Sequence, residues 1–351
     1  MPTWGEILTE INSAAQFLQS QPVAQHINPF DAVRRKYLGL AAAQTKRSTI
    51  VYATAWQQNP SAPAPLITVA DEDMLGFMEA VHGLPGPNLD LILHSPGGSG
   101  TAAEQIVKYL RTKFDHIRII VPHMAMSAAT MIATASDQIL MGKHSFLGPI
   151  DPQVIMQTAL GPRSIAAQAI LEQFERAQRE AVDPAKLRVW APMLAQYGPD
   201  LLVSCQNAAA LSENLVSNWL RQYMFKGDPD ASAKGAAIAQ WLSDHNQFKT
   251  HARPLGRDEL LAKGLKIASL EQNQTEQDLF LSIHHAVSHT FTNTQAVKLI
   301  ENNLGKAYVR AVSAVQPMIL QAPPMAFPPV PKWPAQRKPL WQRLRDAVRG
   351  S

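Results

Sequence analysis

A glycine-rich turn and a nearby serine are the residues of this sequence whose types and spacing suit joint chemistry. The turn, residues 95–100, follows a short apolar run and precedes a helical pattern. Glycines let a backbone approach a ligand closely and direct N–H groups at negative charge. Ser127 begins the next predicted helix among small neighbours that leave its hydroxyl accessible. The pair suits a nucleophile with an oxyanion hole, although a plain N-cap serine is the simpler interpretation of Ser127 from local sequence alone.

The same turn also has the spacing of a dinucleotide-binding fingerprint, Gly-x-Gly-x-x-Ala, beginning at Gly98. That site needs an acidic residue at the end of the following strand, and residues 119–124 contain no carboxylate. The Lys-Ser or Lys-Thr pair of a P-loop is also missing. We therefore expect neither a nucleotide site nor any other cofactor, and no metal site.

Alternating apolar runs and helical patterns must position these residues. We predict strands at 48–55, 89–94 and 117–121, and helices at 30–43, 70–81 and 101–113. This alternation predicts an α/β fold with a mostly parallel sheet. Helical patterns then continue from 165 to 241, with breaks at 183–184 and 198–199, and short helices follow to 309.

The charge of the chain is concentrated in its last segment. The 351 residues carry a formal net charge of +4, and residues 332–351 contribute six cations against one anion, or +5, which leaves 4 − 5 = −1 for residues 1–331. Because residues 1–331 carry no net positive charge, we do not expect this part of the chain to bind nucleic acid. The single cysteine, Cys205, excludes a disulfide scaffold and is interpreted as a buried small residue.

No segment of the sequence predicts insertion into a membrane. Residues 1–21 form an amphipathic pattern without the basic start and apolar centre of a signal peptide. The uncharged stretch 119–136 contains too many polar residues for a span, so we expect a soluble, cytoplasmic protein. Eight prolines at 317–339 predict a disordered basic tail, or a segment that docks on a partner protein or an anionic membrane surface.

Three segments in order, 91–98, 124–133 and 141–153, resemble the serine dehydrogenase proteinase family, relatives of the Clp protease subunit and of signal peptide peptidase A. The resemblance covers about residues 32–265 and implies the ClpP/crotonase-like fold of repeated β-β-α units with a helical C-terminal region. The corresponding divisions are a helical segment at 1–29, a peptidase domain at 30–270, a helical extension at 271–316 and the tail at 317–351. The family also implies a peptide or protein substrate and assembly into homo-oligomers.

Membership implies a catalytic triad of serine, aspartate and histidine in that chain order. Residue by residue, Ser127 is then the nucleophile, Asp151 the acidic member and His251, in a His-x-x-Pro segment, the base. In such a triad the histidine takes the serine proton and returns it to the leaving amine, while the aspartate orients the imidazole. Ala129 departs from the family, which often has glycine two residues after the serine.

The family also implies an oxyanion hole, formed by the backbone N–H of Gly97 or Gly98 together with that of Ala128. Two alternative bases stay open: His144, near the place of a Clp-type histidine, and Lys186, which would form the Ser–Lys dyad of signal peptide peptidases. Two other function classes also stay open. These are acyl-CoA chemistry, which the crotonase fold supports without a serine nucleophile, and a catalytically inert binding module.

Overall fold

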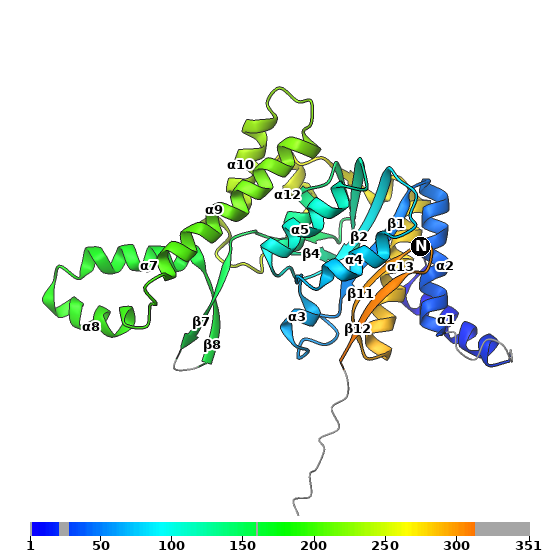
Figure 1. Ribbon diagram of the computed structural model, residues 1–351, viewed down its shortest axis with the longest axis horizontal. Coiled ribbons are helices and arrows are strands. Elements are labelled where there is room, and N and C mark those ends of the chain that lie inside the picture. The colour runs from blue at the N-terminus through cyan, green and yellow to red at the C-terminus, as the bar shows by residue number, and fades with distance from the viewer. Residues whose placement is uncertain (1, 21–27, 159–160, 313–351) are drawn as a thin grey trace, which may run out of the picture. The chain divides into compact units, whose positions relative to one another are not determined.

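A seven-stranded sheet lies at the centre of the computed structural model, which describes residues 2–20, 28–158 and 161–312 (Figure 1). Its strand order is β10-β5-β3-β2-β1-β11-β12. The five strands from β10 to β1 run parallel, and β11 and β12 are antiparallel additions at one edge. The predicted α/β fold with a mostly parallel sheet is confirmed. The strands are β1 (Ser48–Thr54), β2 (Asn88–His94), β3 (His116–Val121), β5 (Gln138–Met141), β10 (Ile267–Ser269), β11 (Ala296–Asn302) and β12 (Ala307–Ala311).

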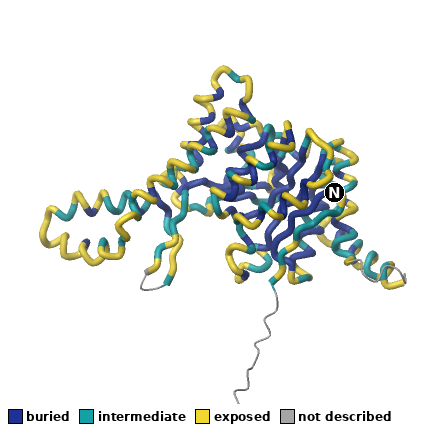
Figure 2. The backbone as a smooth tube through the Cα atoms, in the orientation of Figure 1, coloured by how far each residue is buried: buried dark blue, intermediate teal, exposed yellow. Residues whose placement is uncertain are grey.

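Each face of this sheet is covered by its own group of helices, so the central strands are buried on both sides (Figure 2). Alternate residues of a strand point to opposite faces, and Val51 and Ala53 pack on one side while Ile50 and Tyr52 pack on the other. This explains why β1 and β2 are continuous apolar runs. Helices α1 (Trp4–Gln19), α2 (Pro29–Thr45) and α13 (Gln274–Asn293) cover the first side, and α4 (Asp73–Val81), α5 (Gly100–Arg111) and α6 (Ala128–Thr134) the second.

The helical region predicted from residue 165 is preceded by a hairpin that the sequence did not reveal. Strands β7 (Gln153–Thr158) and β8 (Gly161–Ala166) pair only with each other, and β8 leads directly into α7. The predicted breaks at 183–184 and 198–199 are confirmed as gaps between α7, α8 and α9. Cys205 is fully buried against α7, as expected. The helices are α7 (Ala167–Glu180), α8 (Pro184–Leu194), α9 (Leu201–Trp219), the π-helical η1 (Leu220–Met224) and α10 (Ala231–Ser243).

A second, three-stranded sheet lies beside the large one and consists of very short strands. Its order is β4-β6-β9, in which β4 and β6 are parallel and β6 and β9 antiparallel. These strands are β4 (Met124–Ala125), β6 (Phe146–Leu147) and β9 (Leu255–Gly256). The remaining elements are short helices: α3 (Ala64–Ile67), α11 (His245–Phe248), α12 (Arg257–Ala262) and the 3-10 helix η2 (Leu270–Gln272).

The predicted helical extension at 271–316 is wrong in its second half. Helix α13 is present, but β11 and β12 follow it and complete the large sheet. Lys298 and Glu301 are charged residues of this segment, yet both are buried in β11. Their charges are neutralised inside the protein: Lys298 pairs with Asp73, and Glu301 pairs with Arg34. The strand was missed because the ion-pair partners of its charged residues lie more than 200 residues away in the chain.

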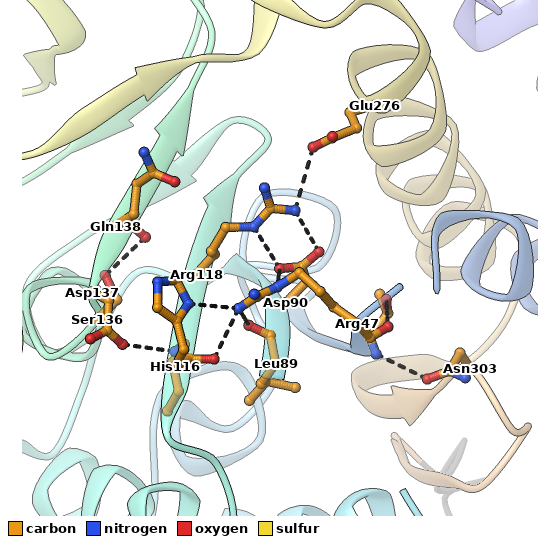
Figure 3. A network of polar contacts seen from close by, with 12 residues as sticks. Arg47, Leu89, Asp90, His116, Arg118, Ser136, Asp137, Gln138, Glu276 and Asn303 are labelled. Atoms are coloured by element: carbon orange, nitrogen blue, oxygen red, sulfur yellow. Dashed lines mark hydrogen bonds and ion pairs between the residues drawn. The ribbon is translucent and has the colours of Figure 1, made fainter. Parts of the chain in front are cut away.

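The buried carboxylate of Asp90 links the N-terminal ends of three neighbouring parallel strands (Figure 3). Asp90 of β2 has a fully buried side chain and accepts hydrogen bonds from Arg47, at 2.6 Å, and from both Nε and Nη2 of Arg118, at 2.8 and 2.7 Å. Arg118 lies on β3 and also reaches Glu276 of α13 at 3.4 Å. The network therefore joins β1, β2, β3 and a covering helix at the end of the sheet opposite the glycine-rich turn.

The described residues belong to one compact unit that ends at Val312. It includes the described parts of the predicted segment 1–29, which are residues 2–20 and 28–29, and the described residues from 30 to 312. Within the described part of the chain, no helix is both long and apolar enough to cross a bilayer. The predicted Pro-rich tail at 317–351 lies outside the described residues.

Replacing Asp90 should destabilise the protein strongly. In Asp90→Ala the two arginines lose their shared buried anion, and breaking a buried ion pair from one side costs about 3 kcal/mol or more. The matched control is Glu175→Ala, because Glu175 and its partner Arg179 are 66% and 70% exposed, and such a surface pair contributes at most about 1 kcal/mol. Urea unfolding monitored by circular dichroism should show a large loss of unfolding free energy for Asp90→Ala but not for Glu175→Ala. Equal midpoints for the two variants would contradict this role.

Candidate active site

Ser127 lies at the junction between β4 and α6, in a backbone conformation that few non-glycine residues adopt. Its φ and ψ are 52° and −121°, and holding such a residue costs roughly 1–3 kcal/mol. Ser127 occupies the N-cap position of α6, but its side chain makes no capping hydrogen bond. The hydroxyl is therefore not used as a plain N-cap, and a strained turn between a strand and a helix presents it at the surface.

The glycine-rich turn packs directly against this serine. Gly97 has φ of 95°, and a Cβ there would lie 2.5 Å from both the Ser127 Cβ and the Met126 carbonyl oxygen. Gly98 has φ of 146°, and its added Cβ would lie 2.4 Å from the carbonyl oxygen of Val69. Both glycines are thus required by conformation and by space. Val69 holds the turn from the other side, since its N–H donates to Gly97 O at 2.7 Å and its O accepts from Ser99 N at 2.9 Å.

Backbone hydrogen bonds join the end of β2 to the segment that carries the serine. Ser95 N donates to Met124 O at 3.1 Å, and Met126 N donates to Ser95 O at 2.9 Å. His94 Nδ1 adds a third bond to Met124 O at 3.1 Å. A carbonyl only accepts, so His94 carries its proton on Nδ1. The turn and the serine are therefore held in one register by the ends of neighbouring strands.

The N–H groups of this turn differ in what they can bind. The Gly97 N–H donates to Ser95 Oγ at 3.2 Å, so it is already occupied. Gly98 is exposed, and no hydrogen bond to its N–H is found among the described residues. Of the two glycines that the sequence left open, the structure therefore favours Gly98 as the donor to a bound oxyanion. Ala128 offers the first N–H of α6, where a helix has no internal acceptor.

Asp151 carries the largest set of polar contacts near the serine. Its side chain is only 3% exposed, and its Oδ1 lies 2.6 Å from His251 Nδ1. Its Oδ2 lies 2.9 Å from His245 Nδ1 and 3.1 Å from Gln153 Nε2. The predicted aspartate and histidine, 100 residues apart in the chain, are thus in direct contact. A second histidine shares the carboxylate.

The small β4-β6-β9 sheet brings these residues together. Ser127 follows β4 by two residues, Asp151 follows β6 by four, and His251 precedes β9 by four. The strands pair as Met124 with Phe146 and as Leu147 with Leu255. Because β6 lies in the middle, the three chain segments leave one short sheet side by side.

A cavity of about 730 Å³ opens where the segments meet. This volume lies in the range of small-molecule and peptide side-chain sites. His251, His245, Met126 and Pro96 all line it, so the two histidines share a space with the immediate neighbours of Ser127 and Gly97. Among the described residues, no hydrogen bond joins Ser127 to either histidine. Catalytic hydrogen bonds of this kind are often long in unliganded proteins and shorten when substrate binds. Apolar groups form most of the wall, including Trp56, Met124, Ile165, Ala166 and Ala169.

The two alternative bases lie elsewhere. Lys186 is an exposed residue of α8 near Glu180 and is not part of the cavity wall. His144 is exposed in the loop between β5 and β6, where its ring lies against Gly142. The structure places neither residue beside Asp151.

His94 belongs to a group of histidines under the glycine-rich turn. Its ring centroid lies 5.7 Å from that of His123 and 5.0 Å from that of His284. Burial, followed by the charge of His123, lowers the pKa of His94 to about 3. Its Nε2 is buried without a hydrogen-bond partner within the described residues. This imidazole is therefore neutral, with its Nδ1–H donating to Met124 O.

The expectation of no metal site took no account of His285 and His289, which have the spacing His-x-x-x-His on α13. His289 Nε2 is bonded to Trp4 O at 2.8 Å, where a carbonyl requires it to be the donor. Within the described ranges, no group of three metal-ligating side chains is arranged to hold an ion.

His245 is the site residue that the sequence did not reveal. It stands six residues before His251, at the start of the four-residue α11. The order Asp-His-x-x-x-x-x-His from Asp244 to His251 was the available signal. It has no meaning until the fold brings Asp151 between the two imidazoles.

Comparisons with known proteins identify a family and two relatives. A profile of ClpP-like SDH-type serine proteinases matches residues 65–269. An uncharacterized protein of Methanocaldococcus jannaschii is 44% identical over 193 residues, which are 55% of this chain and 60% of that protein. A second uncharacterized protein of the same organism is 37% identical over 101 residues, 29% of this chain and 32% of that protein. The chain thus spans less than two thirds of the length of these curated relatives.

The buried His94 should make stability fall in weak acid. Its pKa is about 3 in the folded protein against 6.5 for the ordinary group, so between these values the unfolded chain binds the proton that the folded protein excludes. The free energy of unfolding should therefore decrease as pH falls from about 6.5, by up to about 1.4 kcal/mol per pH unit. His94→Asn keeps a donor for Met124 O. Between pH 7 and pH 5, its free energy of unfolding should fall by about 2 kcal/mol less than that of the wild type.

Urea midpoints between pH 4 and pH 8 would measure this difference. His82→Asn serves as the control, because His82 is exposed and should leave the pH dependence unchanged. Parallel curves for His94→Asn and wild type would disprove the assignment.

Proposed function

The chain belongs to the ClpP-like SDH-type serine proteinase family, and on this premise we propose that it is a serine peptidase that cleaves peptide bonds through an acyl-enzyme on Ser127. Asp151 and His251 complete the proposed triad. The backbone N–H groups of Gly98 and Ala128 form the proposed oxyanion hole.

The contact between Asp151 and His251 is the observation that carries this proposal. An ionised carboxylate only accepts hydrogen bonds, so at 2.6 Å its partner His251 Nδ1 must be the donor. The imidazole then has its lone pair on Nε2, which is the atom a general base needs. His251 also lines the cavity together with Met126, the residue before Ser127.

In the proposed reaction, Ser127 Oγ attacks the peptide carbonyl carbon while His251 Nε2 takes the hydroxyl proton. The carbonyl oxygen becomes an anion, and Gly98 N–H and Ala128 N–H stabilise it. Each such donor is worth on the order of 3 kcal/mol in other serine hydrolases. His251 then gives its proton to the leaving amine as the C–N bond breaks. A water molecule, activated by the same imidazole, releases the acyl group and restores Ser127.

Histidine is preferred to lysine as the base on structural grounds. A lysine acts as a base only when burial or neighbouring cations lower its pKa, and Lys186 is exposed beside Glu180. His144 has no carboxylate contact comparable to that of His251, whose partner Asp151 is buried.

The composition of the cavity wall supports a preference for substrates with large apolar side chains. Trp56, Met124 and Ile165 supply apolar surface on different sides of the space. The wall also contains Lys249, so a basic side chain that enters the cavity would lose hydration without meeting an anion among the lining residues. We therefore extend the proposal to peptides with an apolar residue close to the cleaved bond.

The nucleophile can be tested with a fluorophosphonate probe and fluorogenic peptides. Ser127→Ala should abolish covalent labelling, and His251→Ala and Asp151→Asn should each reduce kcat by about 10⁴-fold. Ser164→Ala is the matched control, since Ser164 lies in the cavity wall, which Ser127 itself does not line, and this variant should label at the wild-type rate. Labelling that persists in Ser127→Ala would reject the proposal. Wild-type protein that neither labels nor cleaves would favour an inert binding module.

The substrate preference can be tested by changing one wall of the cavity. Ile165→Asp places a carboxylate in the wall, so cleavage of a peptide library should shift from apolar residues toward lysine and arginine, by about tenfold or more in relative kcat/KM. Ile155→Asp is the control, because Ile155 lies on the same hairpin but is 72% exposed and outside the wall. Identical cleavage profiles for both variants would show that this cavity does not determine substrate preference.

A further inference from the structure

We propose that His245 is a positioning residue that fixes the Asp151 carboxylate so that its other oxygen can orient His251. This inference rests on the proposed function and adds a fourth side chain to its machinery. The three groups are arranged as His245 Nδ1 to Asp151 Oδ2, at 2.9 Å, and Asp151 Oδ1 to His251 Nδ1, at 2.6 Å.

The protonation of both rings follows from the shared acceptor. An ionised carboxylate has no proton to give, so each Nδ1 that contacts it carries a hydrogen. Each ring therefore donates its Nδ1–H to Asp151, and this contact uses neither Nε2 atom. The two imidazoles are chemically alike at this carboxylate, and their surroundings must assign their roles.

The carboxylate needs a second anchor because the backbone bonds of its own segment do not fix the plane of the side chain. Asp151 lies between β6 and β7, where residues 148–152 form no regular secondary structure. The terminal torsion of an aspartate has a broad energy minimum, so one hydrogen bond does not fix the plane of the carboxylate. His245 and Gln153 both donate to Oδ2. Their two bonds hold that oxygen in place and direct Oδ1 at His251.

The position of His245 agrees with a supporting role. It lines the main cavity and also a second cavity, formed with Gln168, Asp244 and Asn246, whereas His251 lines the main cavity alone. His245 thus lies between two cavities, with its side chain 19% exposed against 25% for His251. His251 is the imidazole confined to the space beside Met126 and Pro96.

Helix α11 holds His245 firmly enough to serve as an anchor. Asp244 caps the helix by accepting from Gln247 N at 3.0 Å. Asn246 donates to Glu172 of α7, and Ile150 N donates to Leu242 O at 2.9 Å just before the helix. The segment that carries His245 is therefore bonded both to α7 and to the residue next to Asp151.

Asparagine substitutions separate positioning from catalysis. The Asn Nδ2 group occupies about the place of histidine Nδ1 but offers no Nε2. The rate of fluorophosphonate labelling should fall about tenfold to hundredfold in His245→Ala, as expected when a charge-assisted hydrogen bond is lost. His245→Asn should return the rate to within about threefold of wild type, because the donor to Asp151 is restored. His251→Asn should stay as inactive as His251→Ala, since a base needs Nε2.

Hydrolysis of p-nitrophenyl acetate adds a second readout, in which His245→Ala should lower kcat and leave KM unchanged. His82→Ala is the control for removal of an exposed histidine. A His245→Ala variant that labels at the wild-type rate would overturn the proposal. So would a His245→Asn variant as slow as His245→Ala, which would make His245 itself the acid–base group.

The arrangement can also be observed without activity. In the ¹⁵N-histidine NMR spectrum of the Ser127→Ala protein, Asp151→Asn should shift the Nδ1 signals of both His245 and His251. If the wild type does not label but both signals shift, the proposed function fails while the shared carboxylate stands. If only the His251 signal shifts, His245 does not bind Asp151 and the positioning role is rejected.

Discussion

The buried ion pair between Lys298 and Asp73 is the interaction on which the geometry of the glycine-rich turn depends. Both side chains are almost completely buried, and Lys298 Nζ also donates to Pro65 O and Thr68 O at 2.9 and 2.8 Å. These bonds fix the segment that leads to Val69, the residue that holds Gly97 and Ser99 by its backbone. A buried pair adds little net stability, but its loss leaves an uncompensated charge inside the protein. Its value here is that it allows one arrangement of the turn.

The same pair reaches the turn by a second route through Tyr52. The hydroxyl of Tyr52 donates to Asp73 Oδ2 at 2.6 Å, and Ser95 lies close enough to influence the pKa of Tyr52. Burial, and then the negative charge of Asp73, raise the pKa of Tyr52 well above its ordinary value, so the hydroxyl keeps its proton. Ser95 Oγ in turn accepts from Gly97 N–H. The N–H of Gly97 is thus occupied by a serine that lies beside this buried polar network.

Features that depend on local sequence could be predicted, and features that depend on distant partners could not. The strands at β1, β2 and β3 are short apolar runs because the sheet is covered on both faces, and that pattern is visible in the residues themselves. The glycine-rich turn and Ser127 were recognisable because conformational freedom and small side chains are local requirements. Strand β11 was hidden, since Lys298, Glu301 and Asn302 look like solvent-facing residues until Asp73, Arg34 and the carbonyl of Ala80 are placed beside them. His245 was hidden for the same reason, because its role exists only through Asp151.

The candidate site thus combines two parts that are held in different ways. Ser127 and the glycines leave the ends of β2 and β4 and are fixed by buried backbone bonds, which makes them rigid before any ligand arrives. Asp151, His245 and His251 stand in connecting segments, and the two-residue strands β6 and β9 join these segments to β4. Thr130 strengthens this link, since its Oγ1 donates to Ala125 O and accepts from Gly148 N, at 2.8 and 2.9 Å. Alignment of the imidazole with the serine therefore depends on few hydrogen bonds, and a carboxylate held by three donors compensates for the short strands that carry it.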